Sequence, residues 1–125
     1  IHKKNGYYYL FASVGSCCEG LKSTYTTVVG RSKNLFGPYV DKQGRPMLEN
    51  NHELLIQKNE HFLGTGHNSE IMTDDAGQDW MFYHAVKASR PRGRVLMLDK
   101  IQWKDGWPYV EGNTPSLVSD KPVFK

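Results

Sequence analysis

The densest group of chemically versatile side chains lies in residues 64–70 (GTGHNSE), which place an imidazole, an amide, a hydroxyl and a carboxylate within seven positions. The two glycines let the backbone pass a tight spot, or approach a ligand, without a Cβ in the way. An imidazole such as that of His67 binds metals and moves protons near neutral pH. The plain alternative is a polar turn at the end of a strand. The segment therefore predicts a site at His67, or a histidine that packs through hydrogen bonds.

A second candidate is the small, glycine-rich loop of residues 13–22 (SVGSCCEGLK). Gly15, Ser16, Cys17 and Cys18 are small enough for a ligand to approach their backbone. Adjacent cysteines cannot join distant parts of the chain, and a disulfide between them is possible but strained and rare. The chain lacks the four-ligand spacing of a zinc site. Ligand contact and a compact loop with two buried thiols remain open.

Carboxylates and a further histidine complete the inventory of reactive groups. Glu19 and Glu70 are of the type that serves as a general acid and base. Asp74 and Asp75 fall in a turn, where we expect them to be solvated. His84 lies within a buried-strand pattern, WMFYHAV, and is expected to be a core histidine with satisfied hydrogen bonds.

The elements that must position these residues are strands separated by tight turns. Asn5-Gly6 is a strong hairpin-turn signal, and the aromatic share of 12% with twelve glycines favours β structure. Apolar, aromatic and β-branched runs predict strands at residues 1–4, 7–12, 23–32, 54–56, 80–86 and 95–103. The tryptophans of the later strands, Trp103 and Trp107, are expected in the core.

Composition excludes some classes of function. The net charge of +3 is mild, and its densest cluster, Arg90-Pro91-Arg92-Gly93-Arg94, is short, so a solvated loop is favoured over a nucleic-acid surface. No apolar run approaches the roughly 18–20 residues of a membrane span. The chain starts at Ile1 without a methionine, and we expect it to be an internal piece of a longer protein.

The two halves of the chain repeat each other. Pro38-Tyr39-Val40 recurs as Pro108-Tyr109-Val110, and the strand sequence YYYLFAS (residues 7–13) lies over DWMFYHA (residues 79–85). A repeated antiparallel sheet is typical of a β-propeller, in which one blade cannot bury both of its faces alone. A β-sandwich is the alternative, although it would not require matching ends.

The motifs NGYYYLFAS, GSCCEG, STYTTVVGRS, FGPYVDKQGRPML, GTGHNSE, WMFYHA and IQWKDGWPYV, in this order, resemble the C-terminal part of glycoside hydrolase family 43. The arabinan-degrading members are the nearest match. The resemblance implies an all-β fold, the last two blades of a five-bladed β-propeller. It assigns residues 1–62 to most of blade four and residues 63–125 to blade five.

The resemblance also implies roles for particular residues. The family hydrolyses with inversion, using three carboxylates that all precede Ile1, so no catalytic residue falls on this chain and Glu19 with Glu70 is not an acid/base pair. His67 would face a calcium ion in the central channel. Because calcium prefers about six to eight oxygen ligands, waters would supply most of its shell. Gly15, Ser16, Cys17 and Cys18 would lie at the rim of the substrate cleft.

The expected function is cleavage of arabinan, or a related arabinose or xylose polymer of plant cell walls such as arabinoxylan, by a secreted or periplasmic protein. The partners are the polysaccharide and the remaining propeller blades, with no nucleic acid and no membrane. The isolated chain is expected to be inactive. A xylosidase or arabinofuranosidase of the same fold, a non-catalytic carbohydrate-binding propeller, and a small β domain with an interaction role remain alternatives.

Overall fold

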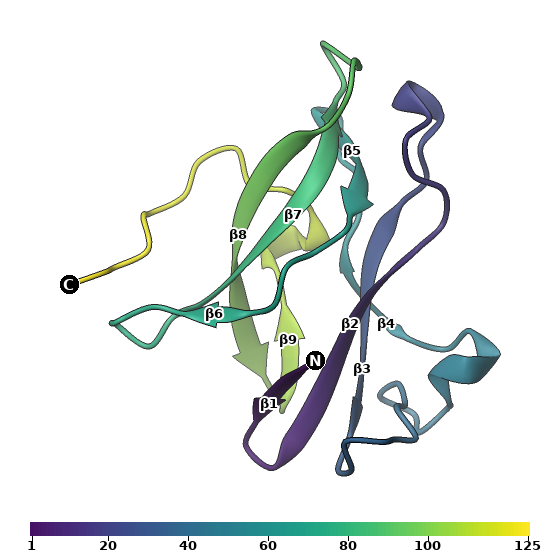
Figure 1. The fold of residues 1–125 in the computed structure, drawn as a ribbon, viewed down its shortest axis with the longest axis vertical. Coiled ribbons are helices and arrows are strands. Elements are labelled where there is room, and N and C mark those ends of the chain that lie inside the picture. Colours follow the sequence, from purple (N-terminus) through teal and green to yellow (C-terminus); the bar gives the residue numbers. More distant parts are fainter.

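The computed structural model describes residues 1–125 as two antiparallel β-sheets that lie side by side (Figure 1). The first sheet is four-stranded, in the order β1 (His2–Lys4), β2 (Tyr7–Val14), β3 (Thr26–Ser32) and β4 (Glu53–Ile56). The second sheet has the order β5 (Phe62–Gly66), β7 (Asp79–Lys87), β8 (Val95–Lys104) and β9 (Trp107–Tyr109), and β6 (Met72–Thr73) also pairs with β7. The all-β class predicted from the sequence is confirmed.

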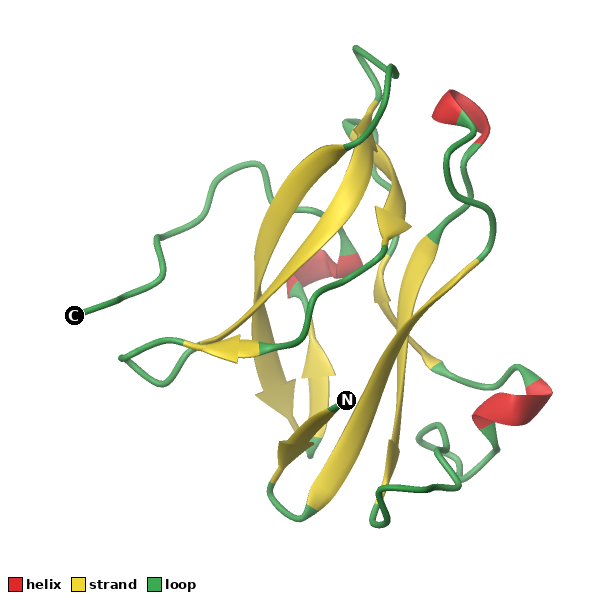
Figure 2. Ribbon diagram, in the orientation of Figure 1, coloured by secondary structure: helices red, strands yellow, loops and turns green.

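Helical structure is limited to three short 3₁₀ turns in the connections (Figure 2). They are η1 (Gly20–Lys22), η2 (Met47–Glu49) and η3 (Glu111–Asn113). None of them is long enough or apolar enough to cross a lipid bilayer.

Tight turns set the register of the hairpins. Asn5 and Gly6 have φ angles of 50° and 84°, and Asp105 and Gly106 have φ angles of 53° and 78°. Both turns therefore place two successive residues in the left-handed region, which matches the twist of a two-residue hairpin. The Asn-Gly signal in the sequence is confirmed.

Strand pairing shows that the two sheets are copies of one unit. Tyr9 pairs with Arg31, and the residues 70 positions later, Asp79 and Ile101, also pair. Arg31 bridges to Val40 beyond β3, while β8 pairs with β9 at the corresponding place. The pairing is therefore consistent with the repeat of 70 residues read from the proline motifs.

The overlay of YYYLFAS on DWMFYHA agrees with the strand bounds, since β2 begins at Tyr7 and β7 begins at Asp79. Each of these residues also closes its hairpin, Tyr7 by pairing with Lys4 and Asp79 by pairing with Thr73. The turn before β7 is longer by three residues than the turn before β2.

A single apolar core joins the two sheets. Its buried members come from both halves of the chain: Tyr9, Phe11, Val29, Leu55, Ile56, Ile71, Met81, Tyr83, Ala85, Ile101 and Val110. Trp107 is also buried, and Trp103 packs against the core. The expectation that these two tryptophans are structural is confirmed.

Polar contacts also hold the sheets against each other. The carboxylate of Asp79, which is only 2% exposed, accepts hydrogen bonds from Lys4 Nζ and Trp103 Nε1, both at 2.7 Å. The guanidinium of Arg31 lies over the rings of Tyr7 and Trp107, at 4.1 and 4.6 Å from their centroids. These contacts join the first sheet to the second near the start of β2 and the start of β7.

Candidate functional site

The two main candidates of the sequence lie close together: the end of β2 runs beside the end of β5, and the loop after β2 continues to the upper end of Figure 1. The loop after β2 carries the cysteines, and the residue after β5 is His67. The backbone N–H of His67 donates a 2.8 Å hydrogen bond to Ser13 Oγ of β2, so the two segments are in direct contact.

The glycines beside His67 are required by close packing. A Cβ added to Gly66 would lie 2.3 Å from Cδ2 of Tyr25, a separation that real Cβ atoms do not adopt. Gly64 has a φ of 62°, and the pairing of β5 with β7 shifts register between Leu63 and Gly66. A bulge of this kind re-aims the end of a strand, and here it directs the His67 backbone toward β2.

His67 occupies one wall of a cavity of about 290 Å³. Its φ of 55° is in the left-handed region, and its side chain is exposed. The imidazole stands edge-on to that of His84, with 5.3 Å between the ring centroids and 81° between the planes. The lining residues are His67, Asn68, Ser69, Phe82, Tyr83, His84 and Leu96.

His84 is not the satisfied core histidine that the sequence predicted. It is half-buried, and its Nδ1 atom is buried without a hydrogen-bond partner. Burial lowers the pKa of His84, and the positive charge of Arg94 and the neighbouring His67 lower it further, so the ring is neutral at neutral pH. Alternation could have found this residue, since Tyr83 and Ala85 are buried while Phe82 and His84 share the other face.

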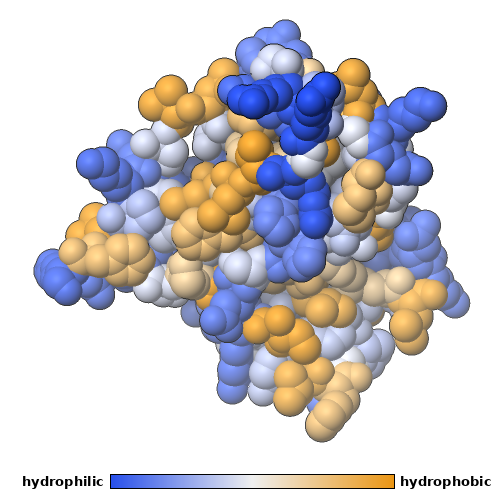
Figure 3. Space-filling view, turned by 45° about the horizontal axis from the view of Figure 1, so that its top comes forward, coloured by the Kyte–Doolittle hydropathy of each residue, from blue (hydrophilic) through white to orange (hydrophobic).

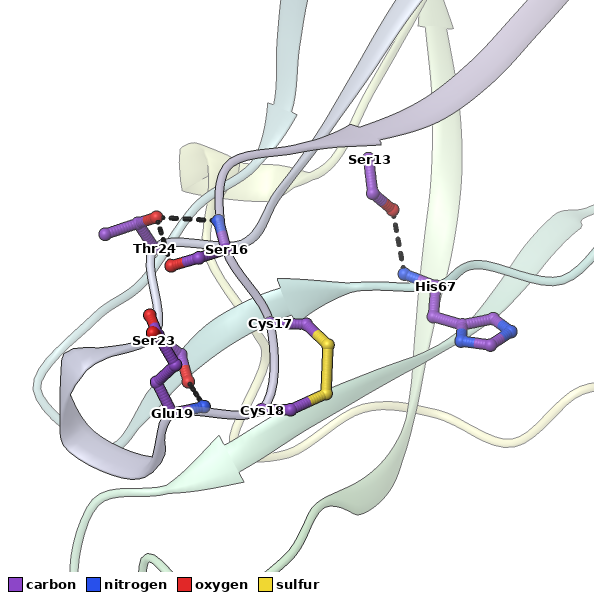
Figure 4. Close-up of a disulfide and its surroundings, with 8 residues drawn as sticks. All are labelled: Ser13, Ser16, Cys17, Cys18, Glu19, Ser23, Thr24 and His67. Carbon is purple, nitrogen blue, oxygen red and sulfur yellow. Dashed lines mark hydrogen bonds between the residues drawn. A yellow bond between two sulfur atoms is a disulfide. The ribbon is translucent and has the colours of Figure 1, made fainter.

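Cys17 and Cys18 are joined to each other, so the reading of this loop as two buried thiols is wrong (Figure 4). The S–S distance is 2.05 Å, Cys18 is exposed, and the chain has no free cysteine. Sequence reasoning treated this pairing as possible but rare, and the structure forms it.

Internal hydrogen bonds rigidify the disulfide loop. The amide N–H of Ser16 donates to Thr24 Oγ1 at 2.9 Å, and the amides of Thr24 and Tyr25 both donate to the carbonyl of Ser16. The open side of Gly15 is filled by Thr24, whose carbonyl oxygen would lie 2.6 Å from an added Cβ. Gly15 therefore allows the loop to pack against Thr24. The exposed surface of the loop is formed by Cys18 and its neighbours.

No pair of carboxylates lines the cavity. Glu19 and Glu70 are exposed and are absent from its walls. Asp74, expected to be solvated, is instead buried, because its carboxylate accepts hydrogen bonds from the turn that follows it, from Trp80 Nε1 and from the amide of Val123. Asp75 is exposed, as expected. The arrangement offers imidazole, amide and hydroxyl groups for binding but no acid and base for hydrolysis.

The donor set is also incomplete for a metal. Nowhere in the chain do three side chains of His, Cys, Asp or Glu converge on one point. Near His67 the described donors are the second imidazole and the neutral side chains of Asn68 and Ser69. A calcium ion there would require oxygen ligands from water or from elsewhere in the protein.

A larger hollow of about 370 Å³ lies between β8 and the C-terminal segment. It is lined in part by Asp99 and Ser116, and the amide of Ser116 donates to the Asp99 carboxylate, so these residues hold the C-terminal segment to the sheet. None of the residues singled out in the sequence lines this hollow.

Known proteins share both the sequence and the fold. The chain is 45% identical over 123 residues to the extracellular exo-α-(1→5)-L-arabinofuranosidase ArbA of Cellvibrio japonicus, covering 97% of this chain and 35% of that protein. It is 37% identical over 105 residues to the extracellular endo-α-(1→5)-L-arabinanase 1 of Bacillus subtilis, covering 84% of this chain and 31% of that protein. The chain thus spans about a third of the length of the curated relatives it matches.

A solved structure agrees with these sequence matches. The α-L-arabinanase of Cellvibrio cellulosa complexed with arabinohexaose superposes with a TM-score of 0.83 at 45% identity, over 90% of this chain and 36% of that one. The fold class expected from the resemblance, two blades of a five-bladed β-propeller, is confirmed by this match. The family model described as "Glycosyl hydrolases family 43" matches residues 1–108. The chain belongs to glycoside hydrolase family 43.

Proposed function

We propose that the protein containing this chain is a glycoside hydrolase that cleaves α-1,5-linked arabinan with inversion, and that this chain supplies part of the cleft but none of the catalytic acids. The observation that carries the proposal is the similarity, at 45% identity and a TM-score of 0.83, to proteins named for arabinan cleavage, one of them complexed with arabinohexaose.

The absence of paired carboxylates in the cavity supports the proposal that the catalytic acids lie outside this chain. An inverting glycosidase places its acid and base about 6.5–9.5 Å apart, with room for a water between them. Glu19 and Glu70 do not line the His67 cavity, and the buried Asp74 and Asp79 have their oxygens occupied by structural hydrogen bonds. The catalytic carboxylates would then come from the rest of the protein.

The rest of the protein has a defined place to attach. β5 pairs with β7 at Gly66–His84 and Leu63–Val86. In the first sheet, β2 corresponds to β7 and extends to Val14. On the edge of β2 that faces away from β3, β1 pairs only with Tyr7 to Tyr9, so the rest of this edge is open. We assign this open edge to the counterpart of β5, a strand of the same blade supplied by another part of the protein, since unpaired strand edges readily accept another strand. On this proposal residues 1–62 form most of blade four and residues 63–125 form blade five.

The disulfide loop is proposed to contact the sugar chain at the cleft rim. The residues proposed for contact, Gly15 to Cys18, follow shortly after Ser13. Ser13 Oγ accepts a hydrogen bond from the backbone N–H of His67, which brings this part of the loop close to His67. The exposed disulfide offers an apolar surface, and the backbone next to it offers polar groups. This combination suits a polyhydroxylated ring with apolar faces.

His67 is proposed to face a calcium ion that carries mostly water ligands. In its support, the imidazole is exposed at the cavity and a buried nitrogen of His84 beside it has no partner in the protein. Calcium would supply a fixed positive charge under the cleft.

The extracellular names of the two relatives favour secretion of the whole protein.

The test is a substrate panel with the full-length protein, using debranched arabinan, arabinoxylan, xylan and the aryl glycosides of arabinofuranose and xylose. We expect release of arabinose or its oligomers from debranched arabinan, with the product first appearing in the inverted anomeric form by proton NMR. Preferential release of xylose would favour the xylosidase alternative. Binding to arabinan without any hydrolysis would identify a non-catalytic propeller.

A further inference from the structure

The positive charge of the chain is concentrated at the end that carries the candidate site. Three segments meet there: the disulfide loop (residues 15–24), the connection before β5 (residues 57–61) and the tip of the β7–β8 hairpin (residues 87–94). They contain six cations against two carboxylates, Glu19 and Glu60; the remainder of the chain has ten cations against eleven carboxylates. The cations are Lys22, Lys58, Lys87, Arg90, Arg92 and Arg94. The net charge of +3 therefore comes entirely from this end.

The cations are unpaired and presented to solvent. All six are exposed, and none takes part in an ion pair within the chain. The hairpin that holds the three arginines is shaped by its own backbone bonds, with the amide of Arg90 donating to the carbonyl of Lys87 and that of Arg92 to Arg90. From residue 80 to residue 98 the sequence contains no carboxylate that could neutralise them. We call the side chains of Arg90, Arg92 and Arg94 the arginine tip.

The arginine tip borders the disulfide loop, and Arg94 precedes by two positions Leu96, which lines the His67 cavity. A methyl group added to Gly20 would lie 3.5 Å from the carbonyl oxygen of Pro91, so the two loops approach each other closely. The amide of Ala88 donates to the carbonyl of His61, which brings the third segment to the same end. In Figure 3, which tilts this end toward the viewer, the most hydrophilic side chains gather at the top of the molecule.

We propose that the arginine tip binds carboxylate groups of an acidic polysaccharide, of the uronic-acid type, while the neighbouring cleft acts on the neutral chain. The inference rests on the proposed carbohydrate function for its choice of partner. Guanidinium groups pair with carboxylates through two parallel hydrogen bonds, and several of them along one loop suit a polymer that carries a carboxylate on each sugar. A neutral arabinan gains nothing from these charges.

The composition of the same end argues against RNA or DNA. The three segments contain no Phe, Tyr or Trp, whereas proteins that bind single strands stack bases on aromatic side chains. The end also carries no α-helix that could enter a duplex groove. A polyanion without bases fits this surface better.

The experiment measures binding of the full-length protein to polygalacturonate, debranched arabinan and poly(U) RNA by isothermal titration calorimetry at 20 and 300 mM salt. The test variant is Arg90→Gln/Arg92→Gln/Arg94→Gln. The matched control removes the same charge at the opposite end of the sheets, through Lys33→Gln/Lys42→Gln/Lys104→Gln. Hydrolysis of arabinan is measured in parallel, so that failure of the proposed function is distinguished from failure of this inference.

We expect polygalacturonate binding that weakens with salt, because exposed charge pairs are screened. The arginine variant should bind it about tenfold more weakly than the parent, while the lysine control and arabinan hydrolysis stay within about twofold. Equal loss in both variants would show only a net-charge effect and overturn the proposal. Absence of polygalacturonate binding, or tighter binding to poly(U), would also overturn it.

Discussion

At the scale of single residues, the site depends on two imidazoles that the sequence places on different strands. His67 follows β5 and His84 lies within β7, and their rings come within 5.3 Å because β5 and β7 are paired at Gly66 and His84. The buried Nδ1 of His84 has no partner within the protein. Buried polar atoms are rarely left unpaired, so such an atom calls for a water or a ligand.

His67→Ala in the full-length protein is expected to lower bound calcium from about one equivalent to well below one, because it removes the only exposed imidazole of the cavity. Metal content after desalting, measured by elemental analysis, checks this. The matched control is His61→Ala, which removes an exposed histidine that does not line the cavity. Unchanged metal content in His67→Ala would reduce this residue to a packing role.

The double substitution Cys17→Ser/Cys18→Ser is expected to raise KM for arabinan about three- to tenfold with a smaller change in kcat, the size of one lost contact. Reduction of the parent with a strong reductant should reproduce the effect and leave the variant unchanged. The measurement is KM and kcat of the parent, the reduced parent and the variant on debranched arabinan. An unaltered KM in both experiments would mean that the disulfide only shapes its own loop.

The sequence identified His67 and the glycines around it but missed how they are used. Gly66 was expected to allow a close approach, and the structure shows that the group approaching is the ring of Tyr25. His84 and the burial of Asp74 were misjudged for a common reason. Each depends on which residue lies across from it in space, and hydrophobic alternation gives only the face on which a residue lies.

At the scale of the elements, β5 is a strand that connects the sheets. Its Thr65 donates to the carbonyl of Ile56 and accepts, at its own carbonyl, a hydrogen bond from the Thr27 hydroxyl of β3. Both threonines are fully buried. The bulge in β5 breaks its pairing with β7, and these contacts replace the lost bonds with bonds to the first sheet.

Gly66→Ala should destabilise the protein by about 1–3 kcal/mol, because the new methyl group overlaps the ring of Tyr25 and the ring or the strand must shift to admit it. Urea unfolding of the full-length protein gives the value. The double variant Gly66→Ala/Tyr25→Ala should be less unstable than the sum of the two single variants. Strict additivity would contradict the claimed overlap.

The C-terminal segment is held to the β6–β7 turn by Asp74. The amide of Val123 donates to this carboxylate and is the largest influence that lowers its pKa, to about 2, with Trp80 and the turn amides adding to it against the effect of burial. A lowered pKa means that the carboxylate stabilises the fold above the ordinary value of 3.8 and that this contribution is lost as pH falls toward about 2.

Asp74→Asn is therefore expected to weaken the attachment of residues 114–125 at pH 6 and to change little at pH 2. Hydrogen exchange at the Val123 amide and urea unfolding between pH 6 and pH 2 provide the measurement. Asp105→Asn is the control, because this exposed aspartate lies in the β8–β9 turn, away from the C-terminal segment. A stability difference between parent and Asp74→Asn that stays constant over this pH range would contradict the assignment.

At the scale of the whole molecule, the all-β class and the 70-residue repeat could be read from the sequence, because both follow from local patterns. The Asn-Gly turn, the alternating strands and the duplicated Pro-Tyr-Val motif each specify nearby structure. How the two copies are joined could not be read. The buried Asp79 that joins Lys4 to Trp103, and the arginine that lies over Tyr7 and Trp107, bring together residues far apart in the sequence.

The same limit applies to function. The order of motifs pointed to glycoside hydrolase family 43, and the family is confirmed by the match over residues 1–108. The role proposed for this chain within the whole protein rests on geometry, namely a cavity with two imidazoles, a loop with a disulfide and no pair of carboxylates at the cavity.

The most direct test of this account is the rate of arabinan hydrolysis by the full-length protein and by its Glu19→Gln/Glu70→Gln variant, measured as kcat on debranched arabinan. The account predicts that the parent releases arabinose or its oligomers and that the variant keeps kcat within about threefold, since these carboxylates lie outside the cavity. Loss of a general acid or base costs about 10²- to 10⁴-fold. A loss of that size in the variant, or no hydrolysis by the parent, would contradict the account.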